Sequence, residues 1–381
     1  MNEYDAVVVG ARCAGSASAM LMARAGLRVL LLDRVHPTRD TLSTHALMRA
    51  GVLQLDRWGL LDRITAAGTP AVTGTTFHYA DAAEHVALTA PLYAPRRTVL
   101  DPILFEAALA AGVEARIGVD VSGVTRADSG RVTGLRHATR GGPEEVVRAA
   151  LTVGADGLRS GIARAVDAGT TWQGEAASAF VFGYWPADGA TDYDWYYRPG
   201  AAAGVIPTND GLACVWAGLP AAEFATRRRA GLDRVFADVL AYAAPGVEFP
   251  AAERVGPLRG FPGVAARLRR PVGDGWALVG DAGSFKDPLT AHGITDALRD
   301  AELLVRAVVD GTSADYAATR DALTLPLLRV AEEIAAYRWD TPAVKQLLRA
   351  ESAAMKPEVD VALAAALAHQ GYALDVIEEA A

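Results

Sequence analysis

Residues 10–26 read GARCAGSASAMLMARAG and decide the fold, because a glycine-rich turn here joins a strand to a helix. The preceding run, YDAVVV at 4–9, is β-branched and apolar, as in a parallel strand buried on both faces. Small residues after the turn suit a helix packed closely on a sheet, and Gly26 follows as its C-terminal stop. A second apolar run, 28–33, ends at Asp33, about where an acid meets a ribose in a dinucleotide-binding unit. The order strand, turn, helix, strand and acid therefore predicts a nucleotide site.

Arg12 stands where the second glycine of such a turn is usual. Gly10 can still make the tight turn, Gly15 can still let helix and strand approach, and the free amides of the helix N-terminus still favour a pyrophosphate. Arg12 could add charge beside the phosphates or point to solvent. On this stretch alone, a chance pair of glycines in an ordinary strand, helix and strand unit is also open.

Two later segments fit the same kind of ligand. Residues 149–160, AALTVGADGLRS, predict a strand running into a glycine-containing turn. Residues 275–301 repeat that order: a strand, then Asp281, then a loop, then a helix that begins close to Gly293. A second acid and a second helix N-terminus suit a cofactor with a polyol chain and a flat ring that becomes negative on reduction.

Together these segments resemble the FAD-dependent monooxygenases of the para-hydroxybenzoate hydroxylase fold, over most of the chain. The resemblance implies FAD bound without a covalent link and NAD(P)H as a transient reductant near the turn at Asp156. It also implies that Arg97 contacts the flavin and precedes a helix, for which Asp101 and Pro102 suit the N-cap and first residue. The implied cofactor residues are Gly10, Arg12, Ala14, Gly15, Asp33, Arg34, Arg97, Asp156, Gly157, Arg159, Gly280, Asp281, Pro288, Gly293 and Ile294.

The loop before the last of these helices is less specific for a reaction. Aromatic hydroxylases of the fold usually carry PP-x-x-GQG-x-N, whereas residues 287–295 read DPLTAHGIT, with His292 and Thr295 in place of glutamine and asparagine. This form also resembles the geranylgeranyl reductase and flavin-dependent halogenase branches of the superfamily. Halogenases are disfavoured, because no W-x-W-x-I-P motif is present and Lys286 is the only lysine in the first 344 residues.

The resemblance therefore implies a single-component, NAD(P)H-dependent flavin monooxygenase. It would hydroxylate or epoxidise an aromatic or polycyclic small molecule, of the kind found in secondary metabolism, with oxygen and through a flavin C4a-hydroperoxide. The alternative is a flavin-dependent reductase of carbon–carbon double bonds, similar to the geranylgeranyl reductases. A flavoprotein that only binds a ligand or partner is disfavoured by the intact set of cofactor residues.

Aromatic and β-branched runs broken by turns fill residues 179–219 and predict short antiparallel strands. In the family such a sheet covers the flavin. The predicted substrate domain comprises residues 71–90 and 166–264. The predicted FAD-binding domain comprises residues 1–70, 91–165 and 265–381, ending in helices for which Pro342 and Pro357 are natural starts.

An aromatic sheet face suits a flat, apolar substrate, although each ring could equally be ordinary core packing. The predicted pocket residues are Tyr184, Trp185, Tyr193 and Trp195. His45, after the second strand, and His292, beside Gly293, are the candidate catalytic residues, because histidine transfers protons near neutral pH. Either histidine could instead be a structural hydrogen-bonding residue.

Composition narrows the class of protein. A formal net charge of −8 disfavours nucleic acid and anionic membranes as partners. No uncharged apolar stretch approaches the roughly 20 residues that span a bilayer, and no signal peptide is evident, so we expect a cytoplasmic protein. Cys13 and Cys214 lie far apart without metal-ligand spacing, so neither a disulfide nor a metal site is expected. We expect a monomer or homodimer.

The predicted fold is α/β: a Rossmann-like FAD-binding domain with an inserted antiparallel β-rich substrate domain and a helical C-terminus.

Overall fold

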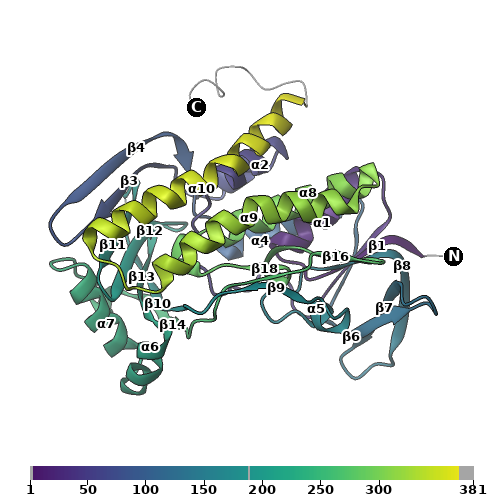
Figure 1. The fold of residues 1–381 in the computed structure, drawn as a ribbon, viewed down its shortest axis with the longest axis horizontal. Helices are drawn as coiled ribbons and strands as arrows, with labels where there is room; N and C mark the ends of the chain where they lie inside the picture. Colours follow the sequence, from purple (N-terminus) through teal and green to yellow (C-terminus); the bar gives the residue numbers. More distant parts are fainter. Residues whose placement is uncertain (1–2, 188, 369–381) are drawn as a thin grey trace.

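The structure is a computed structural model that describes residues 3–187 and 189–368. A mainly parallel sheet lies at one end of the molecule and a mostly antiparallel sheet at the other, with long C-terminal helices running across both (Figure 1). The predicted fold class is confirmed. No helix in the described part of the chain has the length and hydropathy needed to cross a membrane.

The parallel sheet has the strand order β16-β17-β8-β1-β2-β5, with β1 at its centre. Alternate residues of β1 face opposite sides, and both sides are apolar and buried, which explains the uninterrupted run of β-branched residues. The carboxyl ends of the parallel strands β1, β2, β8 and β17 meet at one edge. The bounds are β1 (Tyr4–Val9), β2 (Val29–Asp33), β5 (Glu114–Ile117), β8 (Glu145–Gly154), β16 (Val272–Gly273) and β17 (Trp276–Leu278).

Helices cover one face of this sheet, and an antiparallel ribbon covers the other. The helices are α1 (Cys13–Arg24), α4 (Arg97–Ala110) and α8 (Gly293–Asp310), and α1 packs between the other two. The ribbon is made of β6 (Val119–Arg126) and β7 (Val132–Thr139), which pairs with β8, beside the short helix α5 (Gly161–Ala165). The small side chains of α1 are what allow two helices and a sheet to approach it at once.

The mostly antiparallel sheet, called the roof here, has the order β14-β10-β13-β12-β11-β3-β4. Its strands are β3 (Val72–His78), β4 (Ala83–Leu92), β10 (Ser178–Pro186), β11 (Asp192–Arg198), β12 (Ala201–Pro207), β13 (Leu212–Pro220) and β14 (Val255–Phe261). Two separate stretches of chain thus share one sheet, while the domain limits given above stay a prediction.

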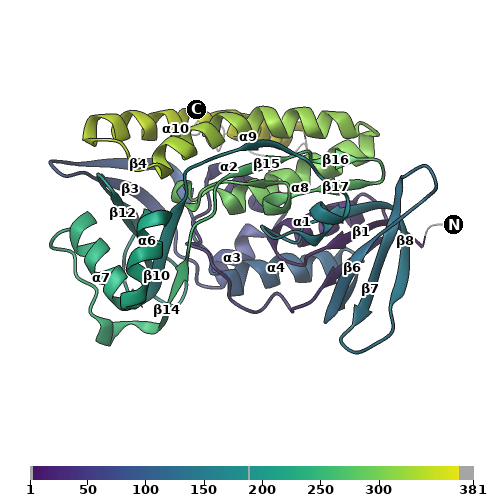
Figure 2. The same ribbon diagram turned by 60° about the horizontal axis from the view of Figure 1, so that its bottom comes forward.

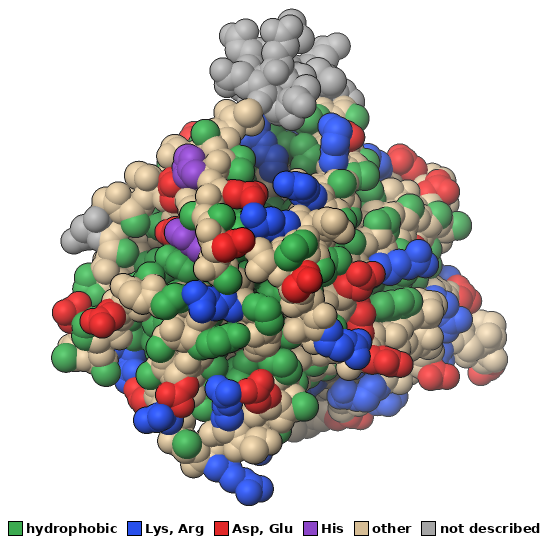
Figure 3. Space-filling model, turned by 60° about the vertical axis from the view of Figure 1, so that its left-hand side comes forward, with side chains coloured by type: hydrophobic (Ala, Val, Ile, Leu, Met, Phe, Trp, Pro, Cys, Tyr) green, Lys and Arg blue, Asp and Glu red, His purple; other side chains and the backbone are tan. Residues whose placement is uncertain are grey.

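The two faces of the roof are both covered. Helices α6 (Ala221–Arg227) and α7 (Leu232–Ala243) lie on the outer side (Figure 2). The inner side packs on the segment between the two C-terminal helices and on the start of the second. On the surface at this end of the molecule, acidic, basic and apolar side chains are interspersed (Figure 3).

The remaining elements join the two sheets. A small sheet of β9 (Thr170–Gln173), β15 (Arg267–Arg269) and β18 (Ser284–Phe285) lies between them, and α9 (Ser313–Ala335) and α10 (Thr341–Ala368) run over both. Helix α10 packs on α2 (Arg49–Arg57), which α3 (Leu61–Ala66) follows. Short 3-10 turns are η1 (Arg228–Ala230), η2 (Ala251–Glu253), η3 (Gly280–Ala282) and η4 (Pro288–Thr290).

Two helix starts predicted from proline were wrong. Asp101 and Pro102 lie inside α4, which already begins at Arg97, because the Asp101 carboxylate pairs with arginines instead of capping the helix. Pro357 lies inside α10, where residues after it still pack on α2. The predicted start of α8 at Gly293 is confirmed.

Gly15 offers a test of the close packing of α1. A Cβ there would lie 1.7 Å from the carbonyl oxygen of Gly10, a backbone atom that cannot move aside easily. We expect Gly15→Ala to lower the free energy of unfolding by about 3 kcal/mol, as measured by urea denaturation. The control is Gly169→Ala, whose added Cβ meets nothing within 4 Å. Equal effects of the two substitutions would show that α1 is not tightly constrained.

Candidate functional site

A cavity of about 1010 Å³ opens where the carboxyl ends of β1, β2, β8 and β17 meet, the usual ligand site of such sheets. The turn after β1, the end of β2, the turn after β8 and the loop before α8 line it from the sheet side, and the roof closes the other side. All predicted cofactor residues line this cavity except Gly15 and Gly280. Those two glycines lie just outside the lining. A Cβ on Gly15 would approach Gly10, and a Cβ on Gly280 would approach Ala14.

Asp33 fixes the first turn of the cavity. Its carboxylate accepts hydrogen bonds from the backbone amides of Ala11, at 2.7 Å, and Val35, at 2.9 Å. Gly10 has φ of +108°, and a Cβ there would lie 2.3 Å from the carbonyl oxygen of Ala155. The first glycine of the motif is therefore required by both backbone conformation and space.

Arg12 is held by an ion pair. Its guanidinium lies 2.9 Å from the buried carboxylate of Asp101 on α4, and Arg97 binds the same carboxylate at 2.8 Å. Arg97 also lies 3.4 Å from Cys13 Sγ. Although burial works against the charge, Asp101 raises the pKa of Arg97 above its ordinary range. The replacement of glycine by arginine thus ties the start of α1 to α4 and leaves two positive side chains beside the turn.

The turn after β8 is held by hydrogen bonds between its own residues. The Asp156 carboxylate accepts from Ser160 Oγ at 2.5 Å and from the amides of Gly161 and Ile162 at 2.6 and 3.1 Å. Ser160 in turn caps α5 by accepting from the Ala163 amide. Asp156 therefore shapes the cavity wall mainly through its own turn.

Asp281 presents a carboxylate to the cavity just after β17. Among the described residues no side chain forms a hydrogen bond or ion pair with it. Burial, with Asp296 and Asp300 nearby, raises the pKa of Asp281 to about 6. A recessed carboxylate of this kind is suited to accept hydrogen bonds from ligand hydroxyl groups.

Both candidate catalytic histidines are buried and line the cavity. His45 has φ of +71°, and its Nε2 lies 2.6 Å from the Tyr184 hydroxyl. Burial, with arginines nearby, lowers the pKa of His45 to about 3, so its ring is neutral at physiological pH. His292 Nε2 lies 2.5 Å from Glu358 Oε1 on α10. In both rings the second nitrogen, Nδ1, is buried and has no hydrogen-bond partner among the described residues.

None of the four predicted substrate residues lines the cavity. Tyr184, Tyr193 and Trp195 are packed in the buried cluster of the inner roof face, and only Tyr184 contacts a lining residue, His45. The prediction for Trp185 was wrong. It follows Tyr184 on β10 and so faces the outer side, where it stacks on Phe236 and donates its indole N–H to a backbone carbonyl.

Sequence reasoning missed several residues that line the cavity or hold it. The wall includes Phe180, Phe182, Phe261, Phe285 and Lys286. The period of two along β10, which places 180, 182 and 184 on one face, was a signal that could have found the first two. No local signal marks Glu358, because its contact with His292 joins residues 66 positions apart.

The residues present fit FAD. The helix N-terminus of α1 and two arginines beside it suit a pyrophosphate, and the unpaired Asp281 suits a ribityl chain. Unpartnered buried nitrogens are costly, so the two free Nδ1 atoms indicate that a ligand completes this wall. The apolar end under the roof suits a flat ring.

Asp281 provides a pH-dependent test. Its folded pKa lies above the unfolded value of 3.8, so the folded state binds the extra proton, and its stabilising effect is lost as pH rises through about 6. In protein without ligand, Asp281→Asn should gain roughly 2 kcal/mol of unfolding free energy relative to wild type between pH 4 and pH 8. Urea denaturation across this range measures the difference, and a difference independent of pH would contradict the assignment.

Comparison with known proteins agrees with this site. A family model for an FAD binding domain matches residues 3–314. Digeranylgeranylglycerophospholipid reductase 1 of Methanopyrus kandleri is 32% identical over 336 residues, 82% of this chain and 84% of the relative.

Two solved structures share the fold. The flavin-dependent brominase Bmp2 has a TM-score of 0.74 at 22% identity, covering 90% of this chain and 88% of its own. The "probable FAD-dependent monooxygenase" PqsL of Pseudomonas aeruginosa has a TM-score of 0.68 at 19% identity, covering 94% and 99%. With the family match over residues 3–314 and the relative at 32% identity, the chain belongs to the FAD-binding domain family and is an FAD-dependent oxidoreductase.

Proposed function

We propose that the protein is a monooxygenase that uses FAD, NAD(P)H and oxygen to hydroxylate or epoxidise a small planar aromatic molecule. The observation that carries this proposal is the aromatic lining of the cavity under the roof. The whole cavity measures about 1010 Å³, at the upper end of ordinary ligand pockets, and it must first accommodate FAD. The end of this cavity under the roof, called the compartment here, is walled by the aromatic rings of Phe180, Phe182 and Phe261.

Different residues of the chain would bind the cofactor and orient the substrate. The turn at Gly10 and the N-terminus of α1 bind the dinucleotide, with Asp281 on the polyol chain. The phenylalanines orient a flat substrate and exclude water, while His45, kept neutral, can accept or donate one hydrogen bond at Nδ1. Bound FAD would supply the redox chemistry, in which the aromatic substrate, NAD(P)H, oxygen and a proton yield the hydroxylated product, NAD(P)⁺ and water.

A reductase of carbon–carbon double bonds is the second candidate. It is favoured by the relative at 32% identity, a digeranylgeranylglycerophospholipid reductase, and by the DPLTAHGIT loop. Such a reaction would use FAD and a reductant but no oxygen. It would act on a long isoprenoid chain, whereas the aromatic rings that wall the compartment suit a flat substrate.

The first experiment separates these two candidates. FAD-loaded protein is reduced with NADPH or NADH and given small aromatic compounds or isoprenoid alkenes, with and without isotope-labelled oxygen. The monooxygenase proposal requires labelled oxygen in an aromatic product and no product without oxygen. A saturated alkene formed without oxygen would establish the reductase instead.

A matched pair of variants tests where the substrate sits. Phe182→Trp should fill the compartment and raise the KM for the aromatic substrate at least tenfold, with FAD binding kept, because Phe182 lines the cavity. The control is Trp185→Phe. It also changes the size of an aromatic side chain on the same strand, but on the outer face, so it should leave the KM unchanged. If the control changes the KM as much as Phe182→Trp does, the compartment is not the substrate site.

A further inference from the structure

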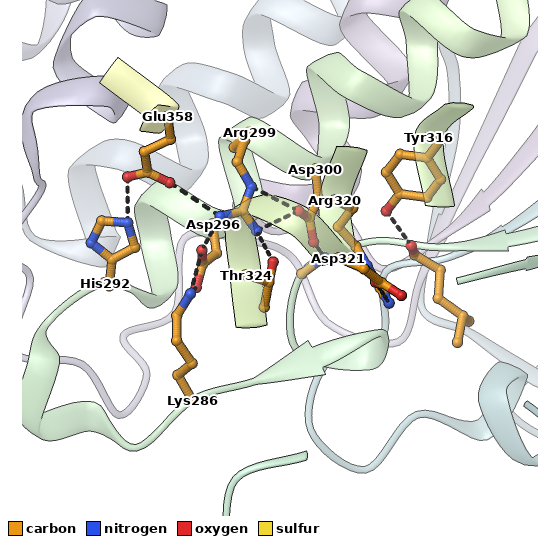
Figure 4. Close-up of polar contacts among 12 residues, drawn as sticks. Lys286, His292, Asp296, Arg299, Asp300, Tyr316, Arg320, Asp321, Thr324 and Glu358 are labelled. Atoms are coloured by element: carbon orange, nitrogen blue, oxygen red, sulfur yellow. Dashed lines mark hydrogen bonds and ion pairs between the residues drawn. The ribbon is translucent and has the colours of Figure 1, made fainter. Parts of the chain in front are cut away.

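His292 belongs to a buried ionic network between the loop before α8 and the C-terminal helix (Figure 4). One carboxylate oxygen of Glu358 faces its Nε2 at 2.5 Å, and the other binds Arg299 at 3.1 Å. Asp296 binds Arg299 at 2.7 Å and Lys286 at 2.6 Å. Both carboxylates are therefore already bound by basic side chains, and this network leaves neither of them free for a ligand.

His45, which also lines the cavity, is held by a phenol instead. Its Nε2 lies 2.6 Å from the hydroxyl of Tyr184 on the inner roof face, and among the described residues this is the one hydrogen bond of that hydroxyl. Both side chains are buried. Burial raises the pKa of Tyr184 above its ordinary value, so the phenol keeps its hydrogen. That hydrogen needs an acceptor, and His45 Nε2 is in position to be it.

The surroundings of His45 favour a neutral ring. Asp40, in the same loop, binds Arg96 at 2.9 Å and Arg259 of β14 at 3.1 Å, so these three groups carry a net positive charge. The two arginines that share the carboxylate of Asp101 form a second group with a net positive charge. Burial, with arginines of both groups nearby, lowers the pKa of His45 to about 3. A further positive charge on the ring is therefore unfavourable.

A neutral imidazole carries one hydrogen, on either Nδ1 or Nε2. If Nε2 carried it, Nε2 would donate to the Tyr184 oxygen, and both the phenol hydrogen and Nδ1 would lack a partner. If Nδ1 carries it, the phenol donates to Nε2 and only the Nδ1–H is left. Unpaired buried polar groups are costly, so the second arrangement is favoured. Tyr184 thereby makes the remaining ring nitrogen of His45 a hydrogen-bond donor.

This donor belongs to the aromatic end of the cavity. Phe182, which walls the compartment, packs on Tyr184 with ring centroids 6.3 Å apart, and His45 Nδ1 is buried without a partner among the described residues. A carbonyl oxygen accepts a hydrogen bond and brings no hydrogen of its own. A phenol would bring one into surroundings where Asp40 is already bound by two arginines. The donor therefore suits a carbonyl group.

We propose that Tyr184 is a positioning residue that fixes the hydrogen of His45 on Nδ1, and that this Nδ1–H binds the carbonyl oxygen of an aromatic substrate under the roof. The proposal rests on the proposed function, because it takes the occupant of the compartment to be the aromatic substrate. It gives His45 a fixed hydrogen bond to the substrate, and no proton transfer by His45 is needed. The substrate class is then an aryl ketone or a quinone.

The first test locates the hydrogen on His45 by NMR, in protein without FAD. In protein with isotope-labelled histidine, the two ring nitrogens give different signals according to which one carries the hydrogen. His45→Asn identifies the signal among the seven histidines, and asparagine tolerates the positive φ of this position. We expect the hydrogen on Nδ1 in wild type, and a shift toward Nε2 of at least about fivefold in Tyr184→Phe. A wild-type ring that is charged at neutral pH, or that carries its hydrogen on Nε2, overturns the proposal.

The control for losing a buried hydroxyl from the inner roof face is Tyr193→Phe. Tyr193 is buried in the same cluster as Tyr184, but no hydrogen bond joins it to His45 in the described structure. This variant should leave the hydrogen of His45 on Nδ1. If the two variants shift it equally, Tyr184 acts only through packing of the roof, and the proposal fails.

The second test compares two probes of nearly the same shape, acetophenone and α-methylstyrene, which carry a carbonyl oxygen and a methylene group at the same place. Their Kd values for FAD-loaded protein are measured through the flavin absorbance. We expect the preference for acetophenone, expressed as the ratio of the two Kd values, to fall about fivefold in Tyr184→Phe, as for the loss of one hydrogen bond. Tyr193→Phe should keep the wild-type ratio. A ratio that is the same in all three proteins contradicts the proposal.

The NMR signal also separates the two possible sources of the acceptor. Acetophenone added to FAD-loaded protein should shift the signal of the Nδ1 hydrogen. A shift on adding FAD, with no change on adding acetophenone, would assign the acceptor to the flavin and overturn the proposal. If the probes behave as expected but no oxygenated aromatic product forms, the proposed monooxygenase fails while the donor at His45 stands.

Discussion

The contact of Gly15 with the carbonyl oxygen of Gly10 is the constraint on which the rest of the structure depends. It brings α1 against one face of the parallel sheet, with its start at the carboxyl edge, and α4 and α8 then pack on either side of α1. The amides at the start of α1 thereby point to the place where the ends of four parallel strands meet. Arg12, where a glycine is usual, strengthens this arrangement, since it ties α1 to Asp101 on α4.

The polar groups around the cavity fall into two kinds. Asp33 and Asp156 on the wall, and Asp101 behind it, are already bound by backbone amides, a serine or arginines, so their role is structural. Asp281 and the Nδ1 atoms of His45 and His292 have no side-chain hydrogen-bond partner among the described residues. A buried ring nitrogen without a partner is rare in a native protein, and both nitrogens, like the partly buried Asp281, belong to residues that line one cavity. Binding specificity therefore resides in the groups that the fold leaves unpaired.

Most of the cavity wall on the sheet side could be predicted from the sequence, because it follows local order: a turn after a strand, or an acid where a strand ends. Gly10, Asp33, Asp281 and the start of α8 are of this kind. The prediction failed where the position of a side chain is set by a partner that is distant in the sequence. Asp101 suits an N-cap locally but pairs with Arg12, which is 89 positions away. Trp185 was grouped with its neighbour Tyr184, although alternate residues of a strand face opposite sides.

The strand order of the parallel sheet also bears on how the chain acquires its shape during synthesis. Strand β1 has β2 as an early neighbour, but its other neighbour, β8, is made more than a hundred residues later, and β17 follows only after the whole roof. Contacts so distant in sequence form slowly, whereas β10 to β13 are joined by neighbouring segments and are complete before β17 leaves the ribosome. The nascent chain can therefore assemble the roof strands first, and the edge that receives the cofactor closes last.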